Sequence, residues 1–468
     1  MADQRALDWL AGRQSRALDT VLPALGRAAN YGRLWQAVAL GLALAGNQRT
    51  RRAALRGLVA LSVASVAANV VSKRMVGRVR PVVEAIPLAR KLARAPLTTS
   101  FPSGHSASAA AFATGVAMEA PAFVAAPVAG LAAAVASSRM VTGAHFPSDV
   151  LGGTALGAGA AALTNVWWPR RPPGPADACR APTAPAAPTG RGVVVVVNRA
   201  AGRAAGVVDA LRTELPDAEV VELGKDPDAQ FRDAARRADV LGVAGGDGTI
   251  NTAARHALAA DVPLLVLPAG TLNHFARDLG VESIADAVRA LRAGSAVRID
   301  VGRAGDEVFL NTWSIGLYAD LVRFRERWEP RVGKWPAMLF GLRHVLRRAE
   351  PLTVHVDGEP RTVWMVFAGN GRYRPQGFAP TSRRRLDDGR LDLRLVDATV
   401  PHIHLRLALG ALTRTLLWTR GYEASAPDRV QIAVPRRDHL NLTVDGEVKR
   451  GPERVEVRVE RGALVVYR

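Results

Sequence analysis

Two histidines and several basic residues lie close together in a part of the chain that is otherwise apolar. "PSGH" (102–105) contains His105, and "SRMVTGAHFPSD" (138–149) contains His145 and Asp149. One imidazole can attack phosphorus while a second protonates the departing alkoxide, provided that a carboxylate fixes the tautomer of the nucleophile. Arginine and lysine, together with a hydroxyl and an amide at a helix start, can surround a phosphate. The residues expected to do so are Lys73, Arg80, Ser103, Gly104 and Arg139.

The order and spacing of these residues resemble the type 2 phosphatidic acid phosphatase signature. Six residues separate Lys73 from Arg80-Pro81, "PSGH" follows, and Ser-Arg, five residues, His, three residues and Asp complete the pattern. The resemblance covers about residues 50–165. It implies that His145 is a nucleophile that forms a phosphohistidine, that Asp149 orients it and that His105 is the general acid. It also implies a phosphorylated lipid as substrate and no metal. A lone "PSGH" would be an ordinary helix cap, so the interpretation depends on all three clusters.

A glycine-rich turn forms a second possible phosphate site. "DVLGVAGGDGT" (239–249) predicts a strand that runs into a turn and then a helix, where the amides of Gly245, Gly246, Gly248 and Thr249 can approach phosphate oxygens. A strand-to-helix turn that simply needs glycine is the structural alternative. The sequence has no Walker P-loop and no GxGxxG fingerprint, which excludes the commonest ATP and NAD sites.

"LPAGTLNHFARDLG" (267–280), together with the GGDGT turn, resembles the diacylglycerol kinase catalytic domain family. "NTWSIGLYAD", "FAGNGRY", "GFAPTSRRRLDDGRLDL" and "DGE" follow in the family's order, so that the resemblance covers about residues 191–468. Soluble NAD kinases share GGDGT, but "TLNHFAR" and "DDGRLD" favour the lipid branch. Two departures are Arg199, where proline is usual, and His274, where many relatives carry Asp.

This resemblance implies ATP and Mg²⁺ as cofactors and assigns roles to residues of this chain. Glu447 would be the general base that accepts the proton of the substrate hydroxyl. Asp388, with Asp387 nearby, would bind Mg²⁺. The residues implied in ATP binding are Asn198, Gly245, Gly246, Asp247, Gly248, Thr249 and Thr271, with Asn273 supporting them.

The elements that must position the first site are Ala- and Gly-rich helices. Apolar stretches cover 53–72, 106–120, 120–138 and 149–168, and small residues let membrane helices pack closely. Basic residues stand before the first apolar stretch and after the last, which predicts that both ends of this helical region lie in the cytoplasm. The polar clusters that contain Arg80, His105 and His145 then lie on the outer face. A soluble Ala-rich bundle is the alternative. Residues 1–47 fit either a further hairpin or an interfacial segment.

The second half predicts alternating strands and helices. A strand over 192–198, a strand that runs into a glycine-rich turn over 239–249 and a further strand over 262–271 indicate an α/β nucleotide-binding layer. The strand-rich stretch after residue 300 predicts a β-sandwich, with the option that the last strands return to the first layer. "LDDGRLDL" and "TVDGEV" each predict a hairpin with an Asp-Gly turn. Residues 331–349 fit an interfacial helix or a core helix equally well.

The predicted organisation is therefore multidomain: an N-terminal all-α transmembrane helical bundle, then a C-terminal α/β nucleotide-binding layer plus a β-sandwich. A chain of 468 residues is too long for one core. Residues 1–166 form the membrane-embedded phosphatase domain, 167–190 a solvent-exposed Pro/Ala-rich linker, and 191–468 the kinase domain. Within the kinase domain, 191–300 is the ATP-binding part and 301–445 the sandwich.

Composition restricts the partners. The net charge of +20 suits an anionic membrane surface, and scattered arginines with few aromatics argue against nucleic acid. The single cysteine, Cys179, forms no internal disulfide. We expect a multi-pass cell-membrane protein that acts on a lipid phosphate outside and a diacylglycerol-like or polyprenol-like alcohol inside. The alternative is that only one half catalyses and the other is a sensor or anchor. The sequence predicts no oligomeric state.

Overall fold

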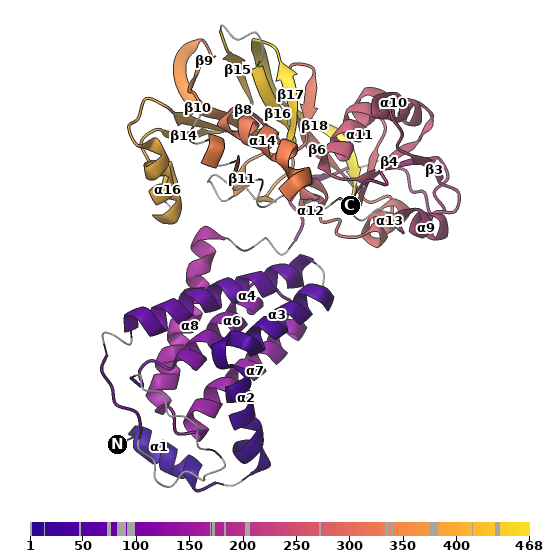
Figure 1. The fold of residues 1–468 in the computed structure, drawn as a ribbon. Coiled ribbons are helices and arrows are strands. Elements are labelled where there is room, and N and C mark those ends of the chain that lie inside the picture. The colour runs from indigo at the N-terminus through magenta and orange to yellow at the C-terminus, as the bar shows by residue number, and fades with distance from the viewer. Residues whose placement is uncertain are drawn as a thin grey trace. The chain divides into compact units, whose positions relative to one another are not determined.

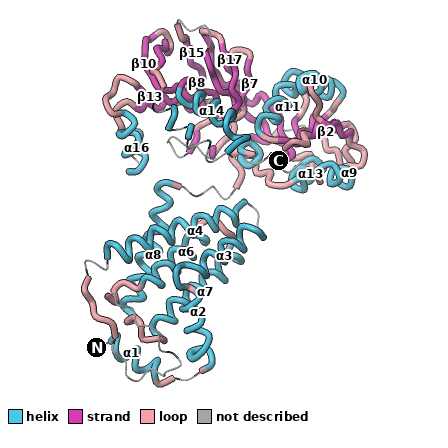
Figure 2. Tube along the Cα trace, viewed as in Figure 1, coloured by secondary structure: helices cyan, strands magenta, loops and turns pink. Residues whose placement is uncertain are grey.

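The computed structural model divides the chain into two compact units, residues 1–171 and 172–468 (Figure 1). It describes residues 2–468 apart from 14, 46–47, 73–75, 82–89, 91–98, 169, 171–173, 182–183, 202–205, 271–272, 333–336, 338–339, 342, 346, 348, 375–381, 414 and 436–439. Figure 2 shows that the first unit is helical and that strands occur in the second.

The first unit is built from helices that pack through small residues. Helix α6 contacts α4, α7 and α8. A Cβ on Gly115 would meet the Cα of Gly57 at 2.9 Å, so α6 and α4 approach with almost no side chain between them. The helices are α1 (Ala2–Ala11), α2 (Leu22–Ala28), α3 (Arg33–Ala45), α4 (Gln48–Val66), α6 (Gly104–Ala117), α7 (Ala122–Val141) and α8 (Pro147–Trp167), with short turns η1 (Ala17–Val21), η2 (Asn30–Gly32) and η3 (Ala67–Ser72).

Among the residues described, one helix, α7, is long and apolar enough by length and composition to cross a membrane. The other expected spans lie in α4 with η3, in α6 and in α8. Helix α6 has 14 residues, which corresponds to about 21 Å and is shorter than the ~30 Å hydrocarbon core of a bilayer. The helical bundle is thus observed, while its crossing of a membrane in several passes stays a prediction.

The second unit begins with the predicted parallel layer. Its strands are β2 (Val193–Val197), β3 (Glu219–Glu222), β4 (Val240–Gly245) and β5 (Leu264–Pro268), which pair in the order β3–β2–β4–β5. Every residue of β2 is a buried valine, as expected for a parallel strand covered on both faces. The helices of this part are α9 (Val207–Glu214), α10 (Pro227–Arg237), α11 (Asp247–Ala260), α12 (His274–Leu279) and α13 (Ile284–Arg292).

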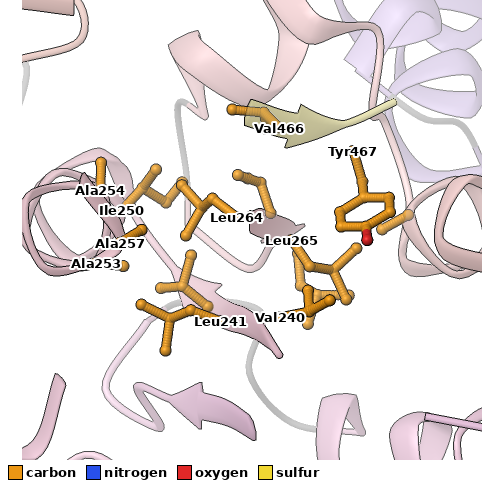
Figure 3. Packing of buried hydrophobic residues seen from close by; sticks show 14 of the residues in the cluster. Val240, Leu241, Ile250, Ala253, Ala254, Ala257, Leu264, Leu265, Val466 and Tyr467 are labelled. Carbon is orange, nitrogen blue, oxygen red and sulfur yellow. The ribbon is translucent and has the colours of Figure 1, made fainter. Parts of the chain in front are cut away.

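Helix α11 packs on this layer through small and branched side chains. Ile250, Ala253, Ala254 and Ala257 are buried against Leu241 and Leu264, and Figure 3 shows them beside these strand residues and Val466. Alanine at three of the four positions lets the helix lie close to the sheet. The packing therefore fixes the N-terminus of α11 directly beyond the carboxyl end of β4.

The remaining strands continue the same sheet. The last strand, β18 (Arg454–Tyr467), pairs in parallel with β5 and antiparallel with β6 (Ala296–Ala304), so it returns to the first layer. The other elements are β7 (Glu307–Phe309), β8 (Thr312–Gly316), α14 (Leu317–Val332), β9 (Leu352–Val356), β10 (Glu359–Asn370), β13 (Leu391–Asp397), α16 (Ile403–Thr413), η5 (Leu416–Trp418), β14 (Tyr422–Ser425), β15 (Arg429–Ala433), β16 (Leu440–Val444) and β17 (Glu447–Gly451).

The topology confirms the expected return of the last strand and joins the strands expected in the β-sandwich to the first layer. Sixteen of the described strands form one hydrogen-bonded sheet, because the long strands β10 and β18 each pair with three or more neighbours. A second apolar core, which includes Phe309, Trp313 and Val457, is nevertheless distinct from the core under α11. Sequence patterns predict strands but not whether long strands join two layers.

The expected exposed linker is corrected. The described residues of 174–190, which exclude 182 and 183, lie along the second unit: β1 (Cys179–Arg180) pairs with β6, and Ala176 and Ala187 are buried. The Tyr467 hydroxyl donates to the carbonyl of Pro185 at 2.6 Å. Small Ala and Pro side chains allow an extended segment to lie flat on a sheet edge, and composition does not distinguish such a segment from a free linker.

One of the two predicted hairpins forms. Asp445 and Gly446 both have positive φ, and they join β16 to β17 as a tight hairpin turn requires. The hairpin predicted over 386–393 is wrong, because β12 (Ser382–Arg383) pairs with β11 (Tyr373–Arg374) instead of β13. Much of 331–349 lies outside the described residues, which leaves its two interpretations open.

Candidate active sites

In the first unit, His145 is buried in the turn between α7 and α8 with a defined tautomer. Its Nδ1 lies 2.7 Å from the carbonyl oxygen of Ser100, which can only accept. Its Nε2 lies 3.3 Å from a guanidinium nitrogen of Arg80, which can only donate. The neutral ring therefore carries its proton on Nδ1 and has a lone pair on Nε2. Burial lowers the pKa of His145, which favours this neutral, nucleophilic form.

Asp149 lies near His145 but is not its closest partner. The nearest carboxylate oxygen of Asp149 is 3.8 Å from Nδ1, against 2.7 Å for the Ser100 carbonyl. The same carboxylate accepts from the amide of Phe146 at 2.8 Å and from Arg78 at 2.8 Å. In this structure Ser100 therefore orients the imidazole directly and Asp149 supports the turn that carries it.

Several of the expected phosphate ligands surround this turn. Arg139 is buried at the end of α7, and its Nε has no hydrogen-bond partner within the described chain, as expected of a donor that binds an anion. Arg80 donates to the carbonyl of Ala144 at 2.7 Å. Ser103 is the N-cap of α6, and Gly104 is the first residue of that helix. Lys73 lies outside the described residues.

Three polar residues that we did not single out from the sequence support this site. His105 Nε2 lies 2.9 Å from the side-chain oxygen of Asn30, at the break between α2 and α3. Arg78 donates to Asp149 and, at 2.8 Å, to Asp3 in α1. Arg78 stands within the basic cluster that precedes Arg80. Nothing in the spacing of Asn30 or Asp3 pointed to either site histidine.

In the second unit, the two glycine-containing loops lie back to back. A Cβ on Gly270 would meet the Cα of Gly246 at 2.6 Å, so position 270 requires glycine. Asp247, the first residue of α11, accepts at 3.2 Å from the amides of both His274 and Phe275 at the start of α12. Its carboxylate therefore links the two loops. This is a structural role beside the expected contact with ATP.

The other expected ATP residues flank these loops. Asn198, after β2, donates to the hydroxyl of Thr249 at 3.1 Å. Asn273 is buried with positive φ and donates to the carbonyl of Gly270 at 2.8 Å. Gly245 ends β4, and a Cβ there would meet Thr249 at 2.7 Å. Thr271 lies outside the described residues. Glycine at 245, 246 and 248 keeps the turn itself free of bulky side chains beside the amides at the N-terminus of α11, which fits a polyphosphate.

Glu447 reaches this surface from the far end of the chain. A Cβ on Gly248 would overlap Oε1 of Glu447, so the carboxylate occupies the space that a side chain would fill. Asp445 fixes the hairpin that carries it, because its carboxylate accepts from the amides of Leu310, Asn311 and Thr312 and from the side chain of Asn251, at 2.7–2.9 Å.

Asp387 and Asp388 lie elsewhere, in the loop before β13. Both oxygens of Asp387 accept, from the Cys179 amide at 2.8 Å and from Arg385 at 3.0 Å. Asp388 accepts from the amides of Arg372 and Arg390, both at 3.1 Å. Within the described ranges no group of three or more His, Cys, Asp or Glu side chains could hold a metal. The role of these two carboxylates as Mg²⁺ ligands stays a prediction.

Comparison with known families separates the same two parts. The PAP2 superfamily matches residues 54–173, and the diacylglycerol kinase catalytic domain matches residues 192–304. A probable lipid kinase YegS-like protein of Pseudomonas fluorescens is 31% identical over 234 residues, which cover 48% of this chain and 75% of the relative. The chain is a PAP2 domain fused to a diacylglycerol kinase catalytic domain.

Further relatives are similar to one domain each. The diacylglycerol kinase of Bacillus subtilis is 28% identical over 225 residues, covering 46% of this chain and 73% of that protein. The crystal structure of the first transmembrane PAP2 type phosphatidylglycerolphosphate phosphatase from Bacillus subtilis has a TM-score of 0.28 and 25% identity, covering 35% of this chain and 83% of that one. The protein is thus a fused phosphatase and kinase enzyme.

Proposed function

We propose that both domains are active, so that one chain removes phosphate from a lipid phosphate and transfers phosphate from ATP to a lipid alcohol of diacylglycerol or polyprenol type. The observation that carries this proposal is that each domain brings its reactive side chain to an anion-binding surface. His145 presents Nε2 beside Arg80, and Glu447 contacts Gly248 at the start of α11.

In the phosphatase domain, Nε2 of His145 attacks phosphorus and the bond to the lipid oxygen breaks. His105 gives its proton to the departing alkoxide, which leaves as the lipid alcohol. Water then attacks the phosphohistidine and gives up a proton to His105, so that inorganic phosphate leaves and both histidines return to their first state. Arg80, Arg139 and the N-terminus of α6 stabilise the negative charge that develops on the phosphoryl oxygens.

In the kinase domain, the oxygen of the lipid hydroxyl attacks the γ-phosphorus of ATP, and ADP is the leaving group. Glu447 accepts the proton that this hydroxyl loses. The amides at the start of α11 hold the phosphates, and Asp247 and Asn273 fix the two loops. ATP enters as its magnesium complex, which supplies neutralising charge. No step is assigned to Asp387 or Asp388, which the resemblance to the kinase family marks as the residues that would hold Mg²⁺.

Placement in the cell follows from charge and from where ATP is found. We propose a multi-pass cell-membrane protein with the phosphatase site on the outer face and the kinase domain in the cytoplasm. Basic residues stand at the start of α4, at 49–56, and after α8, at 170–171. Helix α7 supports a membrane location by its length and composition.

Two single substitutions in the full chain test the function, and each is the control for the other. The H145N variant should lose release of phosphate from a phosphatidic acid panel by at least ~10³-fold and keep the kinase reaction. The E447Q variant should lose transfer of label from ATP to diacylglycerol or polyprenol by at least ~10²-fold and keep the phosphatase reaction. A parent chain that performs only one reaction would show that the other domain is a sensor or anchor.

A further inference from the structure

Helix α16 and the turn η5 expose large apolar side chains on the kinase domain. The side chains of Leu405, Leu409, Leu417 and Trp418 are 61%, 51%, 47% and 86% exposed. Trp418 is thus among the most exposed large apolar residues of the described chain. We call these four residues the α16 surface.

The opposite face of the same helix accounts for its packing. Ile403 and Leu407 are buried one helical turn apart, and with Leu416 they pack on Val400 and Tyr422. The helix is therefore held on the domain through its inner face alone. The α16 surface contributes nothing to that core, and Figure 1 shows α16 beside β14, at the end of the sheet away from α9 and α10.

The charged side chains within residues 398–422, the segment that carries the α16 surface, are all of one sign, and Asp397 and Glu423 adjoin its two ends. Residues 398–422 contain Arg406, Arg414 and Arg420, two histidines and no Asp or Glu. Arg406 and Arg420 are exposed, and neither forms an ion pair within the part of the chain that the structure describes. Exposed leucines and a tryptophan flanked by arginines match a bilayer interface, where apolar side chains enter the acyl boundary and cations meet lipid phosphates.

We infer that the α16 surface docks the kinase domain on an anionic lipid bilayer and delivers it to substrate held there. The inference rests on the proposed lipid kinase function, because a membrane-held alcohol is reached only by a domain seated at the interface. A second copy of the chain would bury the leucines but would place the arginines of both copies near one another. The bilayer is therefore the occupant that the charge favours.

Depth measurement on the full chain tests the docking without any kinase assay. The single cysteine, Cys179, is replaced by serine, and a nitroxide is attached at L409C, at W418C or, as control, at D233C on α10, where the side chain is 71% exposed. The protein is placed in vesicles of phosphatidylglycerol and phosphatidylcholine. We expect oxygen to relax the labels at 409 and 418 more than a water-soluble nickel chelate does, with the reverse at 233.

Two results of this measurement would overturn the inference. Labels at 409 and 418 that respond to the nickel chelate as the label at 233 does would show that the surface stays in water. Spin–spin broadening at 409 and 418 that is confined to these labels would show that a second copy covers the surface. If the surface docks, the R406Q/R420Q double variant should reduce the excess of relaxation by oxygen over relaxation by the nickel chelate at 409 and 418. Vesicles of phosphatidylcholine alone, which lack anionic lipid, should reduce this excess as well.

An activity comparison separates docking from catalysis. The double variant L409S/W418S should phosphorylate long-chain diacylglycerol in vesicles at least ~10-fold more slowly, while its rate on a water-soluble short-chain diacylglycerol changes less than ~2-fold. The D233S variant should match the parent on both. Equal loss on both substrates would contradict docking. If the parent phosphorylates no lipid, the proposed function fails, and the nitroxide depths still decide whether the surface docks.

Discussion

Residue 248 is a point where two distant parts of the chain meet. Glu447 Oε1 lies where a Cβ on Gly248 would stand, so alanine there must displace the carboxylate. The obstacle is the end of a flexible side chain, and the fold can therefore survive the change. We expect G248A to lower kinase kcat/KM by roughly 10- to 100-fold, as for a misplaced catalytic group.

The coupling of the two residues gives this prediction its control. In the G248A/E447Q double variant the loss should equal that of E447Q alone, because both changes remove the same carboxylate from its position. The measurement is steady-state kinase kinetics together with the thermal midpoint of each variant. Losses that multiply in the double variant would show that Gly248 acts independently of Glu447.

In the phosphatase domain, Arg78 likewise joins parts of the chain that are far apart in the sequence. It donates to both Asp149 and Ser148, at 2.8 and 2.6 Å, and to Asp3. R78Q leaves the buried Asp149 carboxylate without its cation and loosens the turn that carries His145. We expect phosphatase kcat to fall roughly 10- to 100-fold with KM nearly unchanged, and R78K to recover part of it.

A larger change in KM than in kcat would place Arg78 in substrate binding instead. The D3N variant, which weakens the same network from α1, should show a smaller loss of kcat. Kinase activity of the same preparations is the internal control, because no contact of this network lies in the second unit.

Sequence patterns indicate candidate reactive residues but not the groups that contact them. The glycine turn and "PSGH" predict anion-binding positions, because helix starts and glycine amides bind anions wherever they occur. Ser100, Asn30 and the Glu447–Gly248 contact could not be predicted, since each depends on how segments far apart in the chain pack. A backbone carbonyl such as that of Ser100 carries no signal in a sequence at all.

At the scale of elements, α6 and α8 meet at a seam of backbone atoms. A Cβ on Gly157 would overlap the carbonyl oxygen of Ala107 and would lie 2.8 Å from the amide nitrogen of Ala111. The backbone of α6 cannot shift to make room for a new side chain as the end of a flexible side chain could. We expect G157V to separate the helices, to abolish phosphatase activity and to lower the thermal midpoint of the first unit.

Gly159, two residues along the same helix, is the matched control for this seam. Nothing lies within 4 Å of the position that a Cβ on Gly159 would take, so G159A should keep parental phosphatase activity and melt no lower. Comparable losses in G157V and G159A would show that the helix itself, and not the seam, is sensitive to substitution.

Elements with a local cause were the ones predicted correctly. The Asp445-Gly446 turn forms because both residues accept positive φ, and the valine strand β2 is buried as its composition indicates. The turn at 387–389 has the same residue types but no hairpin, because Asp388 accepts from Arg372 and the preceding strand pairs elsewhere. Local propensity permits a hairpin, and tertiary pairing decides whether it forms.

For the whole molecule, the boundary between the domains is set by packing and not by composition. The Pro/Ala-rich segment contributes β1 to the sheet, and its Pro175 lies against Gly280, where a Cβ would come within 2.7 Å. Ala176 donates its amide to the carbonyl of Asp278 at 2.7 Å. The kinase domain therefore includes much of what the sequence presented as a linker.

This boundary predicts different stabilities for two truncated proteins. A chain of residues 172–468 keeps β1 and the contact between Tyr467 and Pro185, whereas a chain of residues 191–468 loses both. Each lost hydrogen bond costs about 1 kcal/mol, and each kcal/mol lowers the midpoint by roughly 2 to 4 °C in a domain of this size. We expect the shorter protein to melt at least ~5 °C lower by calorimetry. In the longer protein, Y467F should reproduce part of that loss, since it removes the hydroxyl that holds the segment. Coincident melting curves for the two lengths would mean that β1 and the contact between Tyr467 and Pro185 do not stabilise the domain.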